Sequence, residues 1–173
     1  MGLHKTQGIV IGRRALGESD RLVDFYTRDH GRLRGVAKSA RRTRSRFGSA
    51  LELFTLGELV FFDTGRSELV RVDHFDIVHP FVRVREHLER LGQGAWVVEC
   101  LTRLTADRDP QPALFGLALR SRSFQVFGRP FNEVFRLFQA EPSQFADRLN
   151  DRDFFIFWHG SFEGHFEFGR FRS

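Results

Sequence analysis

Residues 21–37 read RLVDFYTRDHGRLRGVA, and the class of fold follows from this stretch. Residues 21–27 are rich in strand-forming side chains, and residues 32–37 alternate between two faces. Between them, Asp29 and His30 lead into Gly31, and a glycine after polar residues supplies the positive φ that a tight reversal needs. The stretch therefore predicts an antiparallel β-hairpin.

Further strands are predicted on both sides of this hairpin. Residues 8–12 form a short β-branched run, and residues 51–62 and 68–78 also have strand character. In the last of these, the apolar positions shift phase by one residue, the pattern that a β-bulge leaves, and they are Val70, Val72, Phe75 and Ile77. Five short strands joined by turns and one long loop favour a small closed or nearly closed barrel, with the OB-fold as the best match.

Helical periodicity replaces the strand pattern after Pro80. Apolar side chains recur at intervals of three and four and predict one buried stripe, made of Val84, Leu88, Leu91, Ala95, Val98 and Leu101. Asp109 is predicted to cap a second helix, with Pro110 in its first turn, where a missing N–H is tolerated. The apolar positions of that second helix are Leu114, Leu117 and Ala118.

The sequence thus predicts an α+β protein with two domains. Residues 1–80 would form a five-stranded OB-fold β-barrel that binds nucleic acid, and residues 81–173 would form a helical domain. Within the second domain, residues 123–173 are atypical and are expected to be poorly ordered, since 13 of the 21 phenylalanines lie in residues 121–173.

The positive charge of the chain is concentrated at its amino-terminal end. Residues 1–50 hold 12 Lys and Arg against 4 Asp and Glu, and residues 51–173 hold 15 against 18. The net charge is therefore +8 in the first segment and −3 in the second, within a total of +5. This asymmetry indicates an anion-binding face in the first 50 residues.

Five of these cations fall within nine residues, in a segment too polar to be a buried strand. An exposed loop rich in arginine suits phosphate groups, because the planar guanidinium matches their geometry. The predicted DNA-binding residues are Lys38, Arg41, Arg42, Arg44 and Arg46 on the loop, Arg13, Arg14, Arg32 and Arg34 on neighbouring strands, and Phe47 as a base-stacking ring. The alternative is a solubilising loop without a ligand. No base-reading motif accompanies the loop, so we expect weak sequence preference.

Other candidate chemistry is weaker. Cys100 lies on the predicted helix and is expected to pack in the protein core rather than to act as a nucleophile. The histidines that lack zinc-site spacing and are expected on the surface are His74, His79 and His87. No catalytic residue, metal site or cofactor is predicted, although Glu18 and Asp20 leave a metal-dependent nuclease as an alternative. No run of residues is typical of a signal peptide or a membrane span, so we expect a cytoplasmic, nucleoid-associated protein without a membrane partner.

The order of short motifs across residues 1–122 resembles the RecO family of recombination mediators. The matching segments are residues 5–11, 17–22, 27–38, 53–56, 80–81 and 109–115. The resemblance implies an amino-terminal OB-fold, a helical domain, and a DNA-binding loop at the five loop cations. One departure is that many family members carry a Cys-rich zinc module, whereas Cys100 is the single cysteine here.

The resemblance also implies a function. A family member would bind single- and double-stranded DNA without catalysis, anneal complementary strands and help to load the recombinase in RecF-type DNA repair. Its implied partners are RecR and single-stranded-DNA-binding protein. The residues alone equally permit an RNA-binding OB-fold module of translation or ribosome assembly, which stays open as the alternative.

Overall fold

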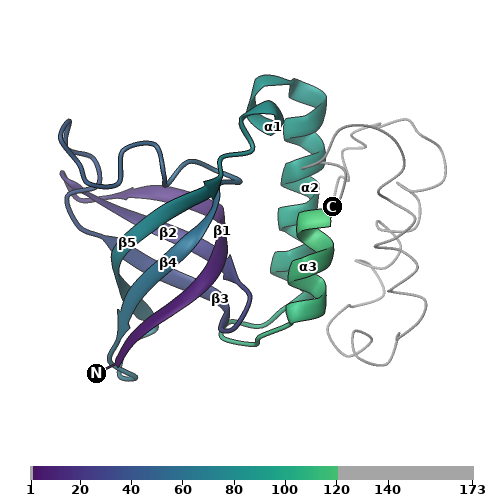
Figure 1. Cartoon of the computed structure of the whole chain (residues 1–173). Helices are drawn as coiled ribbons and strands as arrows, with labels where there is room; N and C mark the ends of the chain where they lie inside the picture. Colours follow the sequence, from purple (N-terminus) through teal and green to yellow (C-terminus); the bar gives the residue numbers. More distant parts are fainter. Residues whose placement is uncertain (1, 121–173) are drawn as a thin grey trace, which may run out of the picture. The chain divides into compact units, whose positions relative to one another are not determined.

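The computed structural model describes residues 2–120, all of which belong to Met1–Gly128, the first of two compact units in the chain. Five strands are followed by three helices (Figure 1). The strands are β1 (Gly2–Leu16), β2 (Asp20–Thr27), β3 (Gly31–Ala37), β4 (Leu56–Asp63) and β5 (Leu69–His79). The helices are α1 (Val82–Glu86), α2 (Leu88–Leu104) and α3 (Pro112–Arg120). The α+β class is therefore confirmed for the described residues.

The strands close into a barrel in the order β1-β2-β3-β5-β4. Closure depends on β1, which is long enough to pair with β4 along its first half and with β2 along its second half. The change of partner falls at Gly8 and Ile9, and a register shift in the β1–β2 pairing follows between Val10 and Gly12. The remaining seam is short and parallel, and it joins residues 34–37 of β3 to residues 69–72 of β5.

The hairpin predicted from residues 21–37 is present. β2 and β3 pair antiparallel from Arg21↔Ala37 to Thr27↔Gly31. Gly31 has a φ of 64°. A Cβ at this position would also collide with the backbone of Asp109, which crosses the turn. Glycine is thus required here both by the left-handed backbone and by the close approach of another segment.

Two further strand predictions have different outcomes. The predicted bulge in β5 is confirmed, since the β4–β5 register shifts between Val60 and Phe61, opposite Asp73. The predicted strand over residues 51–62 is wrong at its start, because β4 begins only at Leu56. Residues 51–55 instead complete the preceding loop, which turns apolar side chains inward without extending the sheet.

The apolar side chains form two clusters. The first fills the barrel and includes Val10, Phe25, Leu33, Phe61 and Val72. The second joins the barrel to the helices, and it includes Ile9, Tyr26, Phe54, Val84, Val97, Leu101 and Phe115. Because one cluster contains residues from both regions, the helices cover one side of the barrel (Figure 1). The domain boundary predicted after residue 80 stays a prediction, and residues 123–173 lie outside the described part of the chain.

The helical stripe predicted after Pro80 is confirmed in part. Val84 and Leu101 are buried, and Leu91 and Val98 pack against the second cluster, whereas Leu88 and Ala95 are exposed. His87 has extended dihedral angles, φ −121° and ψ 125°, and separates α1 from α2. The periodicity is therefore interrupted after Val84, and Leu88 is 84% exposed. The buried residues of α2 are Gly94, Val97, Cys100, Leu101 and Leu104.

The second predicted helix exists but begins later. α3 starts at Pro112 rather than near Pro110, and Phe115 donates its N–H to the carbonyl of Gln111. The prediction that Pro110 lies in the first turn is therefore wrong. Pro112 lies there instead, where its missing N–H has no helical partner. Asp109 instead lies in the segment that crosses the β2–β3 turn.

Candidate nucleic-acid interface

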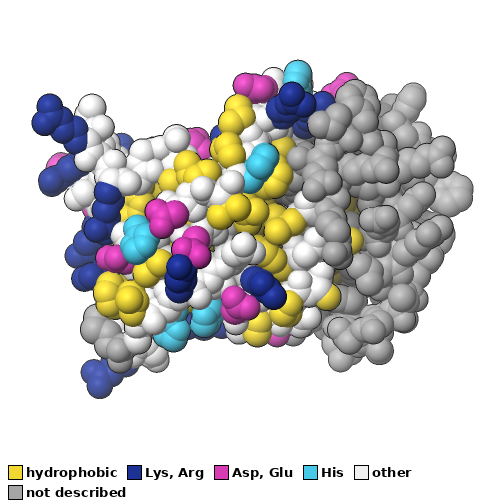
Figure 2. All heavy atoms as spheres, in the orientation of Figure 1, with side chains coloured by type: hydrophobic (Ala, Val, Ile, Leu, Met, Phe, Trp, Pro, Cys, Tyr) yellow, Lys and Arg dark blue, Asp and Glu magenta, His cyan; other side chains and the backbone are white. Residues whose placement is uncertain are grey.

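The basic loop, residues 38–55, joins β3 to β4 and has two kinds of side chain. Its apolar side chains are buried, and they are Ala40, Phe47, Ala50, Leu51 and Phe54. Its cations are exposed, and they are Lys38, Arg41, Arg42, Arg44 and Arg46. Figure 2 shows Lys and Arg side chains gathered at the left of the barrel. The loop is therefore a structured platform whose charges point outward.

Polar contacts fix the start of the basic loop on the β1–β2 turn. The Asp20 carboxylate accepts a hydrogen bond from the N–H of Ser39 at 2.8 Å, and Arg41 donates its backbone N–H to the carbonyl of Ser19 at 2.9 Å. The guanidinium of Arg41 also donates to the carbonyl of Gly17 at 2.8 Å. The bond from Ser39 is the main cause of a lowered pKa at Asp20, with smaller contributions from nearby cations. Asp20 therefore holds the start of the basic loop in place.

The end of the basic loop is attached to β1 and α1. Phe54 donates its N–H to the carbonyl of Val10 at 2.8 Å, and Val10 donates in return to the carbonyl of Thr55 at 3.0 Å. Phe54 adopts a φ of 66°, which is uncommon for a bulky residue. The guanidinium of Arg85 donates to the carbonyls of Leu53 and Pro80. Both ends of the loop are thus held, and the cations lie between them.

The five loop cations differ from the other predicted arginines in their partners. Within residues 2–120, none of the five forms an ion pair at 4.0 Å or less with a carboxylate. By contrast, Arg13 pairs with Glu52, and Arg34 pairs with Asp24 at 2.6 Å. Clustered guanidinium groups without carboxylate partners repel one another, and an approaching polyanion would relieve that repulsion.

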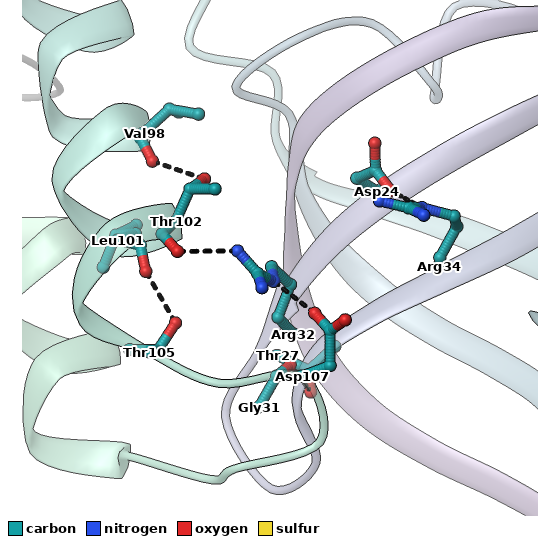
Figure 3. Close-up of polar contacts among 10 residues, drawn as sticks. All are labelled: Asp24, Thr27, Gly31, Arg32, Arg34, Val98, Leu101, Thr102, Thr105 and Asp107. Carbon is teal, nitrogen blue, oxygen red and sulfur yellow. Dashed lines mark hydrogen bonds and ion pairs between the residues drawn. The ribbon is translucent and has the colours of Figure 1, made fainter. Parts of the chain in front are cut away.

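Arg32 lies at the contact between the barrel and the helices, not on the loop surface. Figure 3 shows its guanidinium between the carboxylate of Asp107 and the carbonyl of Thr102, to which it donates at 2.8 Å. The backbone carbonyl of Arg32 also accepts the N–H of Arg108 at 3.0 Å. The prediction that Arg32 extends the DNA-binding surface is therefore corrected, because its side chain is only 20% exposed and its Nε and Nη1 bind partners inside the molecule.

Phe47 requires a second correction. Its side chain is 3% exposed and belongs to the cluster that fills the barrel. The Arg46 guanidinium lies 5.1 Å from the centre of its ring. A buried ring cannot stack on a base, so Phe47 anchors the loop instead. Among the strand arginines, Arg14 is exposed on β1 and stays a candidate contact.

Sequence reasoning also missed a pair on the outer surface of the barrel. The Arg71 guanidinium on β5 lies 4.7 Å from the centre of the Phe62 ring on β4. The two residues are cross-strand partners, and cross-strand partners share a face of a sheet. The signal was present in the alternation of each strand, but the pairing of the strands could not be read from either one alone.

The remaining candidates are Cys100 and the histidines of the described residues. Burial raises the pKa of the Cys100 thiol to about 12, so the thiolate is scarce at neutral pH. The described residues contain no group of three or more His, Cys, Asp or Glu that could hold a metal ion. His74 contacts Asp73, whereas His79 contacts Phe81. None of the helices described is long and apolar enough to cross a bilayer.

Comparison with known proteins matches the barrel to one family. Residues 1–81 match the family described as Recombination protein O N terminal. The DNA repair protein RecO of Syntrophobacter fumaroxidans is 43% identical over 113 residues, covering 65% of this chain and 44% of that protein. The proteins of the same name from Myxococcus xanthus and Listeria monocytogenes are 39% and 32% identical, and the matches cover 68% and 76% of this chain and 48% of each relative. The chain thus spans about half the length of the curated relatives it matches.

Proposed function

This chain belongs to the RecO family through its amino-terminal barrel, and from that premise we propose that it binds DNA through the basic loop in DNA repair. The observation that carries the proposal is the set of five exposed loop cations held between two fixed ends. Phosphate contacts supply most of the affinity in binding of this kind, and they do not depend on base sequence.

We assign the barrel to the OB-fold. Its strand order, β1-β2-β3-β5-β4, is that of a five-stranded barrel in which β1 pairs with both neighbours. Barrels of this class bind oligonucleotides on the β2–β3 face and at the β1–β2 and β4–β5 loops, and the start of the basic loop is hydrogen-bonded to the β1–β2 turn. In this chain the longest loop joins β3 to β4, and it carries the charge.

We further propose that the chain acts as a non-catalytic mediator. Loop arginines that bind phosphate groups of two strands would bring complementary strands together and screen their mutual repulsion. In a RecF-type pathway this activity would accompany loading of the recombinase, with RecR and single-stranded-DNA-binding protein as partners and the nucleoid as the place of action. The family assignment supports this part of the proposal.

Strand annealing tests the proposal. Two complementary labelled strands are mixed with the purified chain, with and without single-stranded-DNA-binding protein. We expect faster annealing with the wild-type chain, and a loss of that acceleration in the Arg41→Ala, Arg42→Ala, Arg44→Ala triple variant. Arg28→Ala, Arg83→Ala, Arg103→Ala removes equal charge away from the loop, so it is the matched control and should anneal like the wild type.

Two further arms separate the alternatives. Added Mg²⁺ should produce no cleavage products, whereas shortened strands would indicate a nuclease. Competition with RNA of equal length should not displace DNA preferentially, whereas preferential displacement would favour the RNA-binding module, since 2′-hydroxyl contacts select RNA. Annealing unchanged by the chain would contradict the mediator proposal.

A further inference from the structure

A belt of outward-facing side chains crosses all five strands of the barrel. Cross-strand partners share a face, so the pairs Leu3↔Phe62, Phe62↔Arg71, Arg71↔Val36, Val36↔Leu22 and Leu22↔Arg14 define one continuous row. The belt therefore consists of Leu3, Phe62, Arg71, Val36, Leu22 and Arg14. It alternates apolar surface with guanidinium groups.

The neighbours of the belt confirm that its side chains face solvent. Phe61 is 1% exposed and Val72 is fully buried, so the adjacent side chains of Phe62 and Arg71 must point to the other side of the sheet. Leu3 is 61% exposed, which is high for a large apolar residue. The Phe62–Arg71 pair thus lies on the surface, with apolar surface beside it.

We infer that Phe62 and Arg71 form a nucleobase-stacking site for a single strand whose phosphates lie on the basic loop. An aromatic ring and a guanidinium plane are both surfaces on which bases stack, whatever their sequence. The inference rests on the proposed DNA binding, and it supplies the stacking surface that the buried ring of Phe47 cannot provide.

The belt lies close enough to the basic loop to serve the same strand. Arg71 is the parallel partner of Val36, one strand spacing or about 4.8 Å away, and Lys38 follows Val36 by two residues, or about 6.6 Å along the strand. A single strand that contacts Lys38, the first of the loop cations, therefore reaches the Phe62–Arg71 pair within one or two nucleotides.

The charge of the surroundings favours the same ligand. The Asp24 carboxylate, beside Leu22 on β2, is paired with Arg34, and the Asp63 carboxylate, next to Phe62, is paired with Arg108. The hydrogen bond from Arg108 is the largest cause of a lowered pKa at Asp63. With these carboxylates neutralised, Arg71 and Arg14 supply positive charge for the phosphates of a bound strand.

The test compares single-stranded and duplex DNA of the same sequence. Phe62→Leu keeps apolar surface but removes the ring, and Arg71→Lys keeps the charge but removes the plane. We expect each variant to lose on the order of tenfold in affinity for the single strand. Affinity for the duplex should not change, because its bases are stacked on one another and cannot stack on the protein. The slope of log K against log salt should not change either, because neither variant removes a charge. Ile77→Ala, an exposed apolar change on the same β5 strand, is the matched control.

The outcomes separate the inference from the proposed function. Single-strand affinity unchanged in Phe62→Leu would overturn the stacking site, and so would equal losses for single strand and duplex, which indicate a general structural role. If the loop triple variant loses binding while Phe62→Leu binds single strands like the wild type, the proposed function stands and this inference fails. If the wild-type chain binds neither form of DNA, both fail.

Discussion

At the scale of single residues, the buried Tyr26 hydroxyl is an unfavourable feature of the contact between the barrel and the helices. Tyr26 is fully buried, its ring lies 6.2 Å from that of Phe115, and its hydroxyl is the one buried side-chain polar atom in residues 2–120 without a hydrogen-bond partner. Burial without a partner leaves the hydroxyl desolvated and uncompensated.

Tyr26→Phe should therefore increase the free energy of unfolding by about 1 kcal/mol. Burial raises the pKa of Tyr26 above its ordinary value, so the folded state keeps the proton while the unfolded state loses it near pH 10. The stability of the wild type should fall as the pH rises above about 10, and the advantage of the variant should widen there. Urea unfolding at pH 7 and pH 10.5 measures both effects, and a less stable variant at both values would contradict the account.

Gly31 and Gly17 give a matched pair of substitutions to alanine. Both have a positive φ, but a Cβ at Gly31 collides with the Asp109 backbone, whereas one at Gly17 meets nothing within 4 Å. Gly17→Ala should cost about 1 kcal/mol of stability from the strained φ alone, and Gly31→Ala about 3 kcal/mol or more. Equal melting temperatures for the two variants would show that the segment around Asp109 does not cross the turn as described.

At the scale of elements, the basic loop depends on its buried side chains. Phe47→Ala should destabilise the chain by about 3 to 5 kcal/mol, because it removes a ring from the barrel core. Phe47→Leu should cost about 1.5 kcal/mol or less and leave DNA affinity unchanged. Chemical unfolding and DNA binding, measured on both variants, test this. Loss of single-strand affinity in a stable Phe47→Leu variant would restore the ring as a base contact.

The strands and the charge of the basic loop could be predicted from sequence, but its structure could not. Alternation and Gly31 predicted the β2–β3 hairpin, and the phase slip in β5 predicted its bulge, because both signals are local. The Phe47 side chain points inward because it packs in the interior of the closed barrel, and that interior is formed by all five strands together. The same holds for Phe62 and Arg71, which meet only through strand pairing.

The helical stripe was wrong only in part, at Leu88 and Ala95, and for a related reason. Periodicity after Pro80 predicted a single stripe, and the extended backbone at His87 reset its phase. Arg32 was expected on the charged surface because it lies among other cations in the sequence. Its partner Asp107 lies 75 residues away, so the pair is visible only in the folded chain.

At the scale of the whole molecule, the barrel and the helices share one apolar cluster. A fragment of residues 1–80 would expose Ile9, Tyr26 and Phe54 and would lose the contacts of Arg85 and Arg108. We expect this fragment to lack a cooperative urea transition, whereas residues 1–128, the compact unit, should keep one. Cooperative unfolding of residues 1–80 with undiminished stability would show that the barrel is an independent domain.

The salt dependence of DNA binding tests the central claim, that the exposed cations of the basic loop bind phosphate groups. If the wild-type chain contacts about four phosphates of a single strand, log K should fall with log salt at a slope of about −3. The Arg41→Ala, Arg42→Ala, Arg44→Ala variant should bind more weakly with a slope of about −1, whereas Arg28→Ala, Arg83→Ala, Arg103→Ala removes equal charge elsewhere and should keep the wild-type slope. Equal slopes for the loop variant and the wild type would contradict the account.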